Sequence, residues 1–147
     1  MSFALDLENF AKKTQIKLDK VVRKVVIDMT SEITYMTPVG YPPIWEHPES
    51  APPGYTGGHL RSNYFWGVQR VASVDPSIDE TGSVSNKRAL AFASGLKAGG
   101  VVYLTNNLPY AMAVEFGHSK MQAPAGMARI TVARFQGMVN KIVQGLR

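Results

Sequence analysis

The sequence contains no cysteine, which excludes disulfides and thiolate metal sites and indicates a reducing compartment or indifference to redox conditions. No stretch approaches the roughly 18 consecutive apolar residues that a membrane span requires. The first residues also lack a basic segment that leads into an apolar one, as in a standard secretory signal. We therefore expect a protein that has no membrane among its partners.

Groups for catalysis are also scarce. Among the three histidines, only His118 has an acid, Glu115, at the i, i+3 spacing that places two metal ligands together on a helix. Gly117 lies between them, and no second pair is present to complete a coordination shell. There is no Gly-x-Ser-x-Gly motif and no glycine-rich turn between a strand and a helix. The sequence predicts no catalytic, metal or cofactor site, and a small hydrolase would lack its nucleophile and base.

The composition is typical of one globular domain, residues 1–147. A hydrophobic content of 45% can form a single core, and a second core would have too few apolar side chains. Lys and Arg number 16 against 11 Asp and Glu, which gives a formal net charge of +5. This balance favours contact with a polyanion without identifying one.

Residues 7–36 have the pattern of a long amphipathic helix. Apolar residues recur at steps of three or four, so they share one helical face. Pro38 ends the helix, because proline disfavours the helical conformation of the residue before it. Basic residues lie largely off the apolar face, and we predict that Lys17, Lys20 and Lys24 face DNA in a channel. The simpler alternative is a basic face in contact with solvent.

Residues 38–58 are rich in proline and glycine and predict a long loop without regular structure. Trp45 and Tyr55 in this loop are candidates for contact with another subunit. The alternative is that Ile44 and Trp45 simply fold under the loop.

Two segments in the middle of the chain have the composition of strands. Residues 59–74 form the first, which Asp75 and Pro76 end. Residues 101–105 form the second, and a turn over residues 106–109 closes it. We expect at least these two strands in a small, mainly antiparallel sheet.

Helices flank these strands. Ser85 or Asn86 would cap a short helix that runs to residue 96. Residues 110–116 predict a second short helix, and residues 127–146 predict a C-terminal amphipathic helix. The predicted fold class is α+β, with a small, mainly antiparallel sheet flanked by a long N-terminal helix, a short middle helix and a C-terminal helix, and with a long proline-rich loop.

Positive charge by itself supports one alternative, a nonspecific DNA-binding protein. No acidic residue follows Glu115, so the C-terminal segment is basic and, like the first helix, could contact phosphates. Neither segment carries a helix-turn-helix, zinc-finger or aromatic RNA-binding motif, which argues against sequence-specific recognition. Such a protein would bind DNA as a free monomer in a salt-dependent way.

Several segments, in order, resemble a family of phage proteins. Residues 55–62 (YTGGHLRS) resemble the Thr-Gly-x-Leu-Arg-x-Ser element of phage neck and minor tail proteins of the lambda protein Z type. Residues 103–111 (YLTNNLPYA), 114–120 (VEFGHSK) and 122–127 (QAPAGM) resemble the family's Asn-x-x-Pro-Tyr-Ala, Glu-x-Gly-x-Ser and Gln-Ala-Pro-x-Gly-Met series at the usual spacing. The resemblance covers nearly the whole chain, and its motifs are structural rather than catalytic.

The sequence departs from the family pattern in two places. Gly58 and His59 lengthen the Thr-Gly-x-Leu element by one residue, and Pro42 to Pro53 form an unusually large insert. These departures leave the conformation and contacts of the loop open.

The resemblance implies a structural virion protein, not an enzyme, that completes the tail or neck where the tail of a phage joins its head. Further copies would form a ring, a hexamer or dodecamer, between a head-completion protein and a tail terminator or tail tube protein. Phage DNA would pass through the lumen without specific contacts. The protein would be found in the host cytoplasm during assembly and then in the virion.

A closed ring needs two different contact patches on each subunit. Besides Trp45 and Tyr55, the candidates for these patches are Glu115, His118 and Arg134. For Glu115 the simpler alternative is a cap or an ion pair within the chain, with a nearby arginine such as Arg61 or Arg129.

The segment around Glu115 should form a corner between the second strand and a helix. Asn106 and Pro109 would make the turn, Tyr110 and Phe116 would pack against it, and Gly117 would let the backbone reverse.

Overall fold

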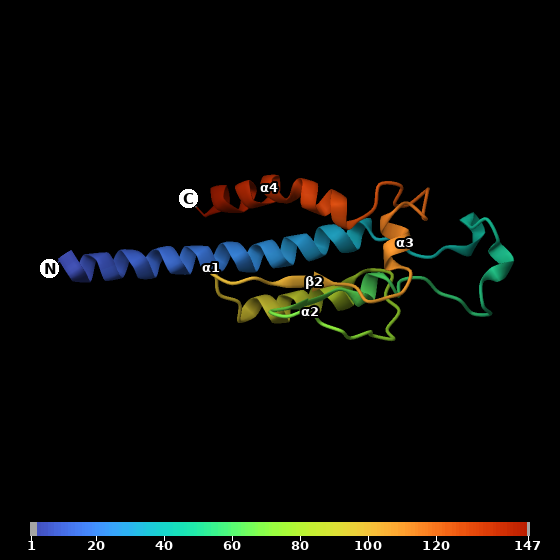
Figure 1. Ribbon diagram of the computed structural model, residues 1–147, viewed down its shortest axis with the longest axis horizontal. Helices are drawn as coiled ribbons and strands as arrows, with labels where there is room; N and C mark the ends of the chain where they lie inside the picture. Colours follow the sequence, from blue (N-terminus) through green and yellow to red (C-terminus); the bar gives the residue numbers. More distant parts are fainter. Residues whose placement is uncertain (1–2, 147) are drawn as a thin grey trace.

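The computed structural model describes residues 3–146 and shows an elongated molecule arranged along one long helix. This helix, α1 (Phe3–Met36), lies between the C-terminal helix α4 (Ala128–Gly145) on one side and helix α2 (Ser83–Ser94) with two strands on the other (Figure 1). The fold is α+β, as the sequence predicts. None of the described helices is both long and apolar enough to span a bilayer.

Helix α1 begins at Phe3, earlier than the predicted residue 7, and ends at Met36 close to Pro38. Its middle and C-terminal half bury Val26, Thr30 and Thr34. The two threonine hydroxyls donate to carbonyls one turn earlier on α1, at 2.7 Å each, so they cause no unsatisfied polar group in the core. Thr30 Oγ1 also accepts a hydrogen bond from Trp66 Nε1 at 2.7 Å, which ties α1 to the sheet.

The sheet has two antiparallel strands, β1 (Phe65–Gly67) and β2 (Tyr103–Thr105). In their register Phe65 pairs with Thr105 and Gly67 pairs with Tyr103. The prediction of a small antiparallel sheet is confirmed. The prediction of one strand over residues 59–74 is wrong for most of its length, because a 3-10 turn (Arg61–Asn63) precedes β1 and the chain after it is irregular.

Local side-chain hydrogen bonds explain why residues 59–74 do not form one strand. Asn63 is fully buried, and its side-chain amide donates to the carbonyl oxygens of His59 at 2.7 Å and Asp75 at 3.0 Å. Its side-chain oxygen accepts the backbone N–H of Asp75 at 2.8 Å. Ser62, also fully buried, donates to Ser77 O at 2.5 Å. These bonds compete with a β-ladder and fold the segment back on itself.

Helix α2 begins at Ser83, before the predicted caps. Asp79 caps it instead, because one carboxylate oxygen accepts the backbone N–H of Val84 at 2.7 Å. The predicted caps have other roles. Ser85 Oγ donates to Arg61 O at 2.6 Å, and the Asn86 amide donates to Gly82 O at 2.8 Å.

Two clusters of buried side chains form the core, and α1 contributes to both. The larger one gathers residues from distant parts of the chain around the C-terminal end of α1. Its members are Ile33, Leu60, Tyr64, Leu108, Val114, Ala123 and Met127. The smaller one packs α2 on the middle of α1 through Val26, Ala89 and Ala93.

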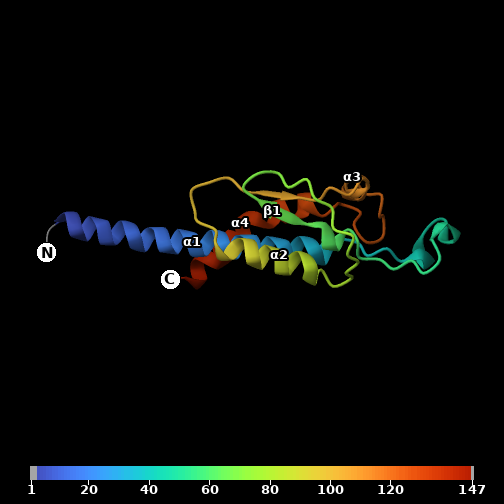
Figure 2. The same cartoon turned by 90° about the horizontal axis from the view of Figure 1, so that it is seen from below.

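The short helix α3 (Ala111–Glu115) follows β2 and lies close to its predicted place. The proline-rich loop extends away from the body at the end opposite to the N-terminal part of α1 (Figures 1 and 2). The loop is not wholly irregular, since 3-10 turns form at Pro42–Ile44 and Pro48–Ser50. The prediction of no regular structure is therefore corrected, because proline favours the first position of such turns.

Candidate DNA-facing and subunit-contact surfaces

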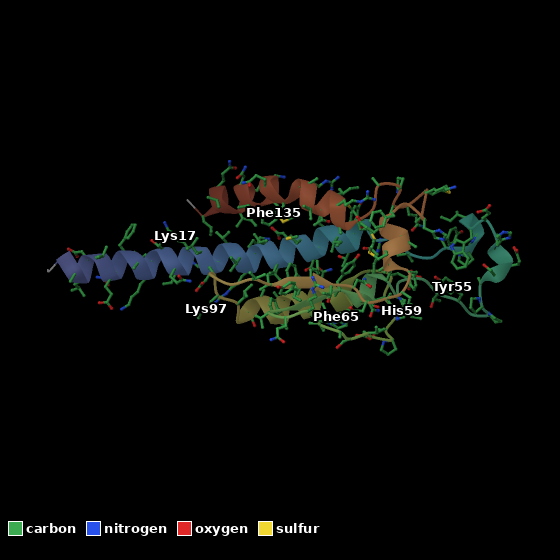
Figure 3. The ribbon with its side chains drawn as sticks, viewed as in Figure 1. Lys17, Tyr55, His59, Phe65, Lys97 and Phe135 are labelled. Carbon is green, nitrogen blue, oxygen red and sulfur yellow. The ribbon has the colours of Figure 1, made fainter. Side chains whose placement is uncertain are left out.

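The N-terminal part of α1 extends beyond α2 and α4, and its lysines are exposed (Figures 2 and 3). Lys17, Lys20 and Lys24 follow one another at steps of three and four, so they share one helical face. Lys24 Nζ contacts the Asp28 carboxylate at 2.5 Å, which neutralises one end of the face. Lys17 and Lys20 form no ion pair with any described residue, so their charges are available for an external anion.

Asp19 marks the place where this part of α1 leaves the body. Asp19 is only 6% exposed, and its carboxylate accepts hydrogen bonds from Ala98 N and from the Gln15 side chain, both at 2.8 Å. The Ala98 N–H is the main reason why the pKa of Asp19 lies below its ordinary value. Arg23 also turns toward this junction and donates to Leu96 O at 2.8 Å. Arg23 therefore lies apart from the exposed lysine face.

Sequence reasoning missed Asp19. The only available signal was one acid within a run of basic residues, and that signal does not distinguish an exposed ion pair from a buried hydrogen bond. The partner, Ala98, lies 79 positions away and offers only its backbone N–H, which no side-chain pattern reveals.

Glu115 is the centre of a polar corner that joins separate parts of the chain. One carboxylate oxygen accepts the backbone N–H groups of Met127 and Ala128, both at 2.8 Å. The other accepts Arg129 N at 3.0 Å and Arg129 Nε at 3.1 Å. Glu115 thus caps the start of α4 from a different part of the chain, and its negative charge lies where the helix dipole is positive.

The hydrogen bonds of Glu115 also set its protonation. Burial by itself would raise the pKa of this carboxyl, but the three backbone N–H donors and Arg129 outweigh it and lower the pKa below its ordinary value. The capping and pairing role that the sequence left open for Glu115 is observed, with Arg129 as its arginine. The role of Glu115 in a subunit contact stays a prediction.

Arg61, the other arginine considered for Glu115, caps α1 instead. Its guanidinium donates to Thr37 O at 2.8 Å, to Tyr35 O at 3.1 Å and to Glu80 O. These bonds satisfy carbonyls that the end of α1 leaves without partners in the helix. Arg61 therefore connects the end of α1 to the segment that precedes α2.

Gly126 lets the backbone of the corner approach Glu115. Its φ is +86°, and a Cβ there would lie 2.4 Å from Glu115 O and 2.6 Å from Glu115 Oε1. Any larger residue would therefore compete with the cap for the same space. The cap that the Glu115 carboxylate forms on α4 therefore depends on glycine at position 126.

The turn after β2 differs in part from its prediction. Asn106 forms the corner as expected, since its amide donates to Leu60 O at 3.0 Å and its side-chain oxygen accepts Leu108 N at 3.3 Å. Phe116 does not pack the corner down: it is 66% exposed and lies under the Arg129 guanidinium at 4.9 Å. Tyr110 is likewise exposed. Buried Leu108 takes their place, because it joins the larger core cluster.

The remaining interface candidates do not form one patch. Trp45 and Tyr55 pack edge to face in the loop, with their ring centroids 5.1 Å apart, and Figure 3 shows Tyr55 far from Lys17. His118 is exposed near the corner. Arg134 on α4 is also exposed and pairs with Glu32 on α1. The candidates thus occupy the loop, the corner and α4.

Ile44 is exposed in the loop, whereas Trp45 is partly covered by Tyr55. The alternative that Ile44 and Trp45 fold under the loop therefore applies only to Trp45. Within residues 3–146 no group of three or more His, Asp or Glu side chains is placed to bind a metal ion.

Comparisons of the chain with protein-family models, with curated proteins and with solved structures found no match in any of the three.

Proposed function

We propose that this protein is a structural subunit of the neck or tail-completion region of a tailed phage, where it forms part of a ring that joins the tail to the DNA-filled head. The proposal rests on the resemblance of residues 55–62 and 103–127 to phage neck and minor tail proteins. No enzymatic activity is part of this proposal.

One observation carries the proposal furthest. The segments that bear the resemblance lie far apart in the sequence, yet they meet around the end of α1. Leu60, Leu108 and Met127 belong to one core cluster. Asn106 bonds Leu60 O, and Glu115 holds the residues that begin α4. Motifs of a structural protein should have such a role, because they maintain the shape that neighbouring subunits contact.

The exposed lysines of α1 supply the second part of the proposal, a basic passage for DNA. A channel that DNA crosses needs positive charge without base-specific groups. Lys17 and Lys20 offer this on a helix that extends from the body, where the lysines of several copies would come together in a ring.

The mass of the protein in solution tests the ring. Light scattering after size exclusion, over a range of concentrations and with or without tails that lack this subunit, should give a closed ring or a monomer that becomes a ring only on tails. A monomer that ignores tails and binds DNA with a steep salt dependence would instead establish the alternative, a nonspecific DNA-binding protein.

Reversal of charge on the lysine face tests the DNA passage. The triple variant K17E/K20E/K24E should fold normally, because all three side chains are exposed. Infectious titre should fall about tenfold or more, because three side chains that attract phosphates would then repel them. Titre in a plaque assay and the fraction of joined particles in electron micrographs are the measurements.

The matched control is K87E/K120E/K141E, which makes the same change of charge at three exposed lysines outside the extending part of α1. The control should keep titre near that of the parent protein. Normal infectivity of K17E/K20E/K24E, or an equal loss in both variants, would remove the lysine face from the DNA path.

A further inference from the structure

A pocket opens between the C-terminal end of α1 and the loop that precedes α4. Its volume is about 560 Å³, which lies within the range of pockets that hold a ligand. Met36, Val39, Pro124 and Ile130 contribute apolar walls, and Arg61 is the one charged residue among the described residues that line it. We call it the Arg61 pocket.

Arg61 retains the capacity to bind an acid. A guanidinium has five N–H groups, and Arg61 uses three of them on the backbone oxygens of Tyr35, Thr37 and Glu80, so two remain. No carboxylate within residues 3–146 forms an ion pair with Arg61. The carbonyl oxygens at the end of α1 offset only part of its charge.

The charges around the Arg61 pocket do not neutralise it. Two complete ion pairs lie beside the lining residues Met36 and Gly126. These pairs are Glu32 with Arg134 and Glu115 with Arg129. The carboxylate of Glu80 is exposed and forms no ion pair with Arg61. Lys120, on the loop that precedes α4, is exposed and has no ion-pair partner among the described residues, so the pocket and its rim have an excess of positive charge.

The proline-rich loop, residues 38–58, carries the opposite charge. Its acids are Glu46 and Glu49, and it contains no Lys or Arg. His47 Nδ1 lies 3.0 Å from a carboxylate oxygen of Glu49. Glu46 is therefore the acid of this loop that has no ion-pair partner within the described chain.

The shape of the loop presents this acid together with an apolar side chain. Two 3-10 turns order the loop, and the ring of Trp45 packs on Tyr55. Ile44 and Glu46, on either side of Trp45, are both exposed. The loop extends away from the body, so it leaves the Arg61 pocket of its own chain open (Figures 1 and 2). A loop that is already ordered loses less conformational entropy when it binds.

Other surfaces suit Ile44 and Glu46 less well. A groove between α1 and α4 is lined by equal numbers of acids and bases, so its charges cancel. These are Asp28 and Glu32 against Arg134 and Lys141. The face of α1 that carries Lys17 and Lys20 would attract a carboxylate, but it is the convex surface of an exposed helix and cannot enclose an apolar side chain.

We propose that the Arg61 pocket binds the proline-rich loop of a second copy of this chain. Glu46 of that copy accepts the two remaining N–H groups of Arg61, and Ile44 packs against the apolar walls. The pocket and the loop are different surfaces, so the contact repeats from copy to copy, as a closed ring requires. The closure of a ring through this contact rests on the proposed function.

A covalent trap tests the contact. One loop in a pocket buries less than the roughly 1,600 Å² of a stable interface, so the contact between two isolated copies is weak. The absence of cysteine leaves only the introduced thiols to react. Two differently tagged proteins, one Ile44→Cys and the other Gln122→Cys in the pocket wall, are mixed and oxidised. We expect a disulfide-linked heterodimer in higher yield than with Lys87→Cys, an exposed site on α2 that measures random collision.

Reversal of charge in the loop tests the role of Glu46. Glu46→Lys, added to the Ile44→Cys protein, should lower the heterodimer yield about tenfold, because an attraction to Arg61 becomes a repulsion. Glu49→Lys is the matched control, since it makes the same change of charge in the same loop. It should change the yield by about twofold or less. Both glutamates are exposed, so both variants should fold, which circular dichroism checks.

A bulky residue in the pocket tests the other side of the contact. Ala125→Trp, added to the Gln122→Cys protein, fills the pocket and should remove most of the heterodimer. Ala91→Trp, at an exposed position of α2, should leave the yield unchanged.

Several results would overturn the contact. They are a yield no higher than with Lys87→Cys, a higher yield with Lys17→Cys than with Gln122→Cys, or equal losses for the two glutamate variants. A single chain with both Ile44→Cys and Gln122→Cys that closes a disulfide within itself would also overturn it, because the loop would then fill the pocket of its own chain.

The contact and the proposed function fail separately. If the parent protein forms a ring and neither Glu46→Lys nor Ala125→Trp weakens that ring, the proposed function stands and this contact falls. If the heterodimer responds to both variants as expected but no ring forms with or without tails, the contact stands and the proposed ring falls.

Discussion

Replacement of Gly58 by alanine should destabilise the protein by about 3 kcal/mol or more, because it combines backbone strain with a collision against other backbone atoms. The φ of Gly58 is +110°, a conformation that residues with a side chain rarely adopt. A Cβ at this position would lie 2.5 Å from the carbonyl carbon of Asp79 and 2.6 Å from Glu80 N. Neither atom can rotate away as the end of a side chain can.

A displacement caused by the Gly58→Ala side chain would also affect α2. The Gly58 carbonyl accepts Ser62 N at 3.1 Å and Asp79 N at 3.4 Å, so it joins the end of the proline-rich loop to the segment that precedes α2. Asp79 in turn caps α2 through Val84 N. A displaced Asp79 would weaken that cap, for which losses of about 1 kcal/mol are typical.

Gly54→Ala is the matched control for Gly58→Ala. Gly54 also has a positive φ, +72°, but a Cβ there would meet nothing within 4 Å. It should cost only the backbone strain, about 1–2 kcal/mol. Urea denaturation followed by circular dichroism gives both free energies of unfolding. Equal losses in the two variants would show that the close approach of Gly58 to Asp79 contributes nothing to stability.

Periodicity predicted the parts of the fold whose stability depends on one apolar face. Helices α1 and α4 repeat apolar residues every three or four positions, and both form where this pattern predicts them. The segment over residues 59–74 has apolar and aromatic residues that suit a strand, but its structure is decided by Asn63 and Ser62. Their bonds to residues 75 and 77 depend on a chain reversal that strand composition does not encode.

The candidate surfaces were predictable to a different degree. Exposure of Lys17 and Lys20 follows from the apolar face of α1, since a lysine off that face meets solvent. Arg23 breaks this rule, because α2 covers another side of the same helix and brings Leu96 O within 2.8 Å. One helical period identifies one buried face. It cannot identify a second face that a later element covers.

Glu115 shows which contacts the charges in a sequence can predict and which they cannot. Opposite charges allowed an ion pair with Arg61 or Arg129, and the structure contains the pair with Arg129 at 3.1 Å. The sequence could not predict that the three backbone N–H groups at the start of α4 bind Glu115, because any residue except proline supplies the same group. Which carboxylate meets them depends on the reversal at Gly117 and on the close approach at Gly126.

Replacement of Glu115 by alanine should cost about 2–3 kcal/mol, because it removes a charged acceptor from three backbone N–H groups at a helix start. The side chain of Glu115 is largely buried, so solvent replaces these bonds poorly. Arg129→Ala is the control. Its side chain is more than half exposed, and loss of its ion pair should cost about 1 kcal/mol or less. A larger loss for Arg129→Ala than for Glu115→Ala would assign the stability of the corner to the ion pair instead.

The pH dependence of the unfolding free energy shows whether the negative charge of Glu115 stabilises the protein. Glu115→Gln tests this, because glutamine has nearly the same size and shape but no charge. The pKa of Glu115 in the folded protein lies below the ordinary value of 4.5 that the unfolded chain would show. The unfolded state therefore takes up the proton first as pH falls, so the contribution of Glu115 is complete above pH 4.5 and is lost on acidification through the folded pKa.

The difference in unfolding free energy between the parent protein and Glu115→Gln should be constant near neutral pH and shrink below pH 4.5. Asp19 and Asp79 also have lowered pKa values, but both proteins retain them, so their acid sensitivity cancels in the difference. A difference that stays constant down to pH 2 would mean that the carboxylate charge does not stabilise the start of α4.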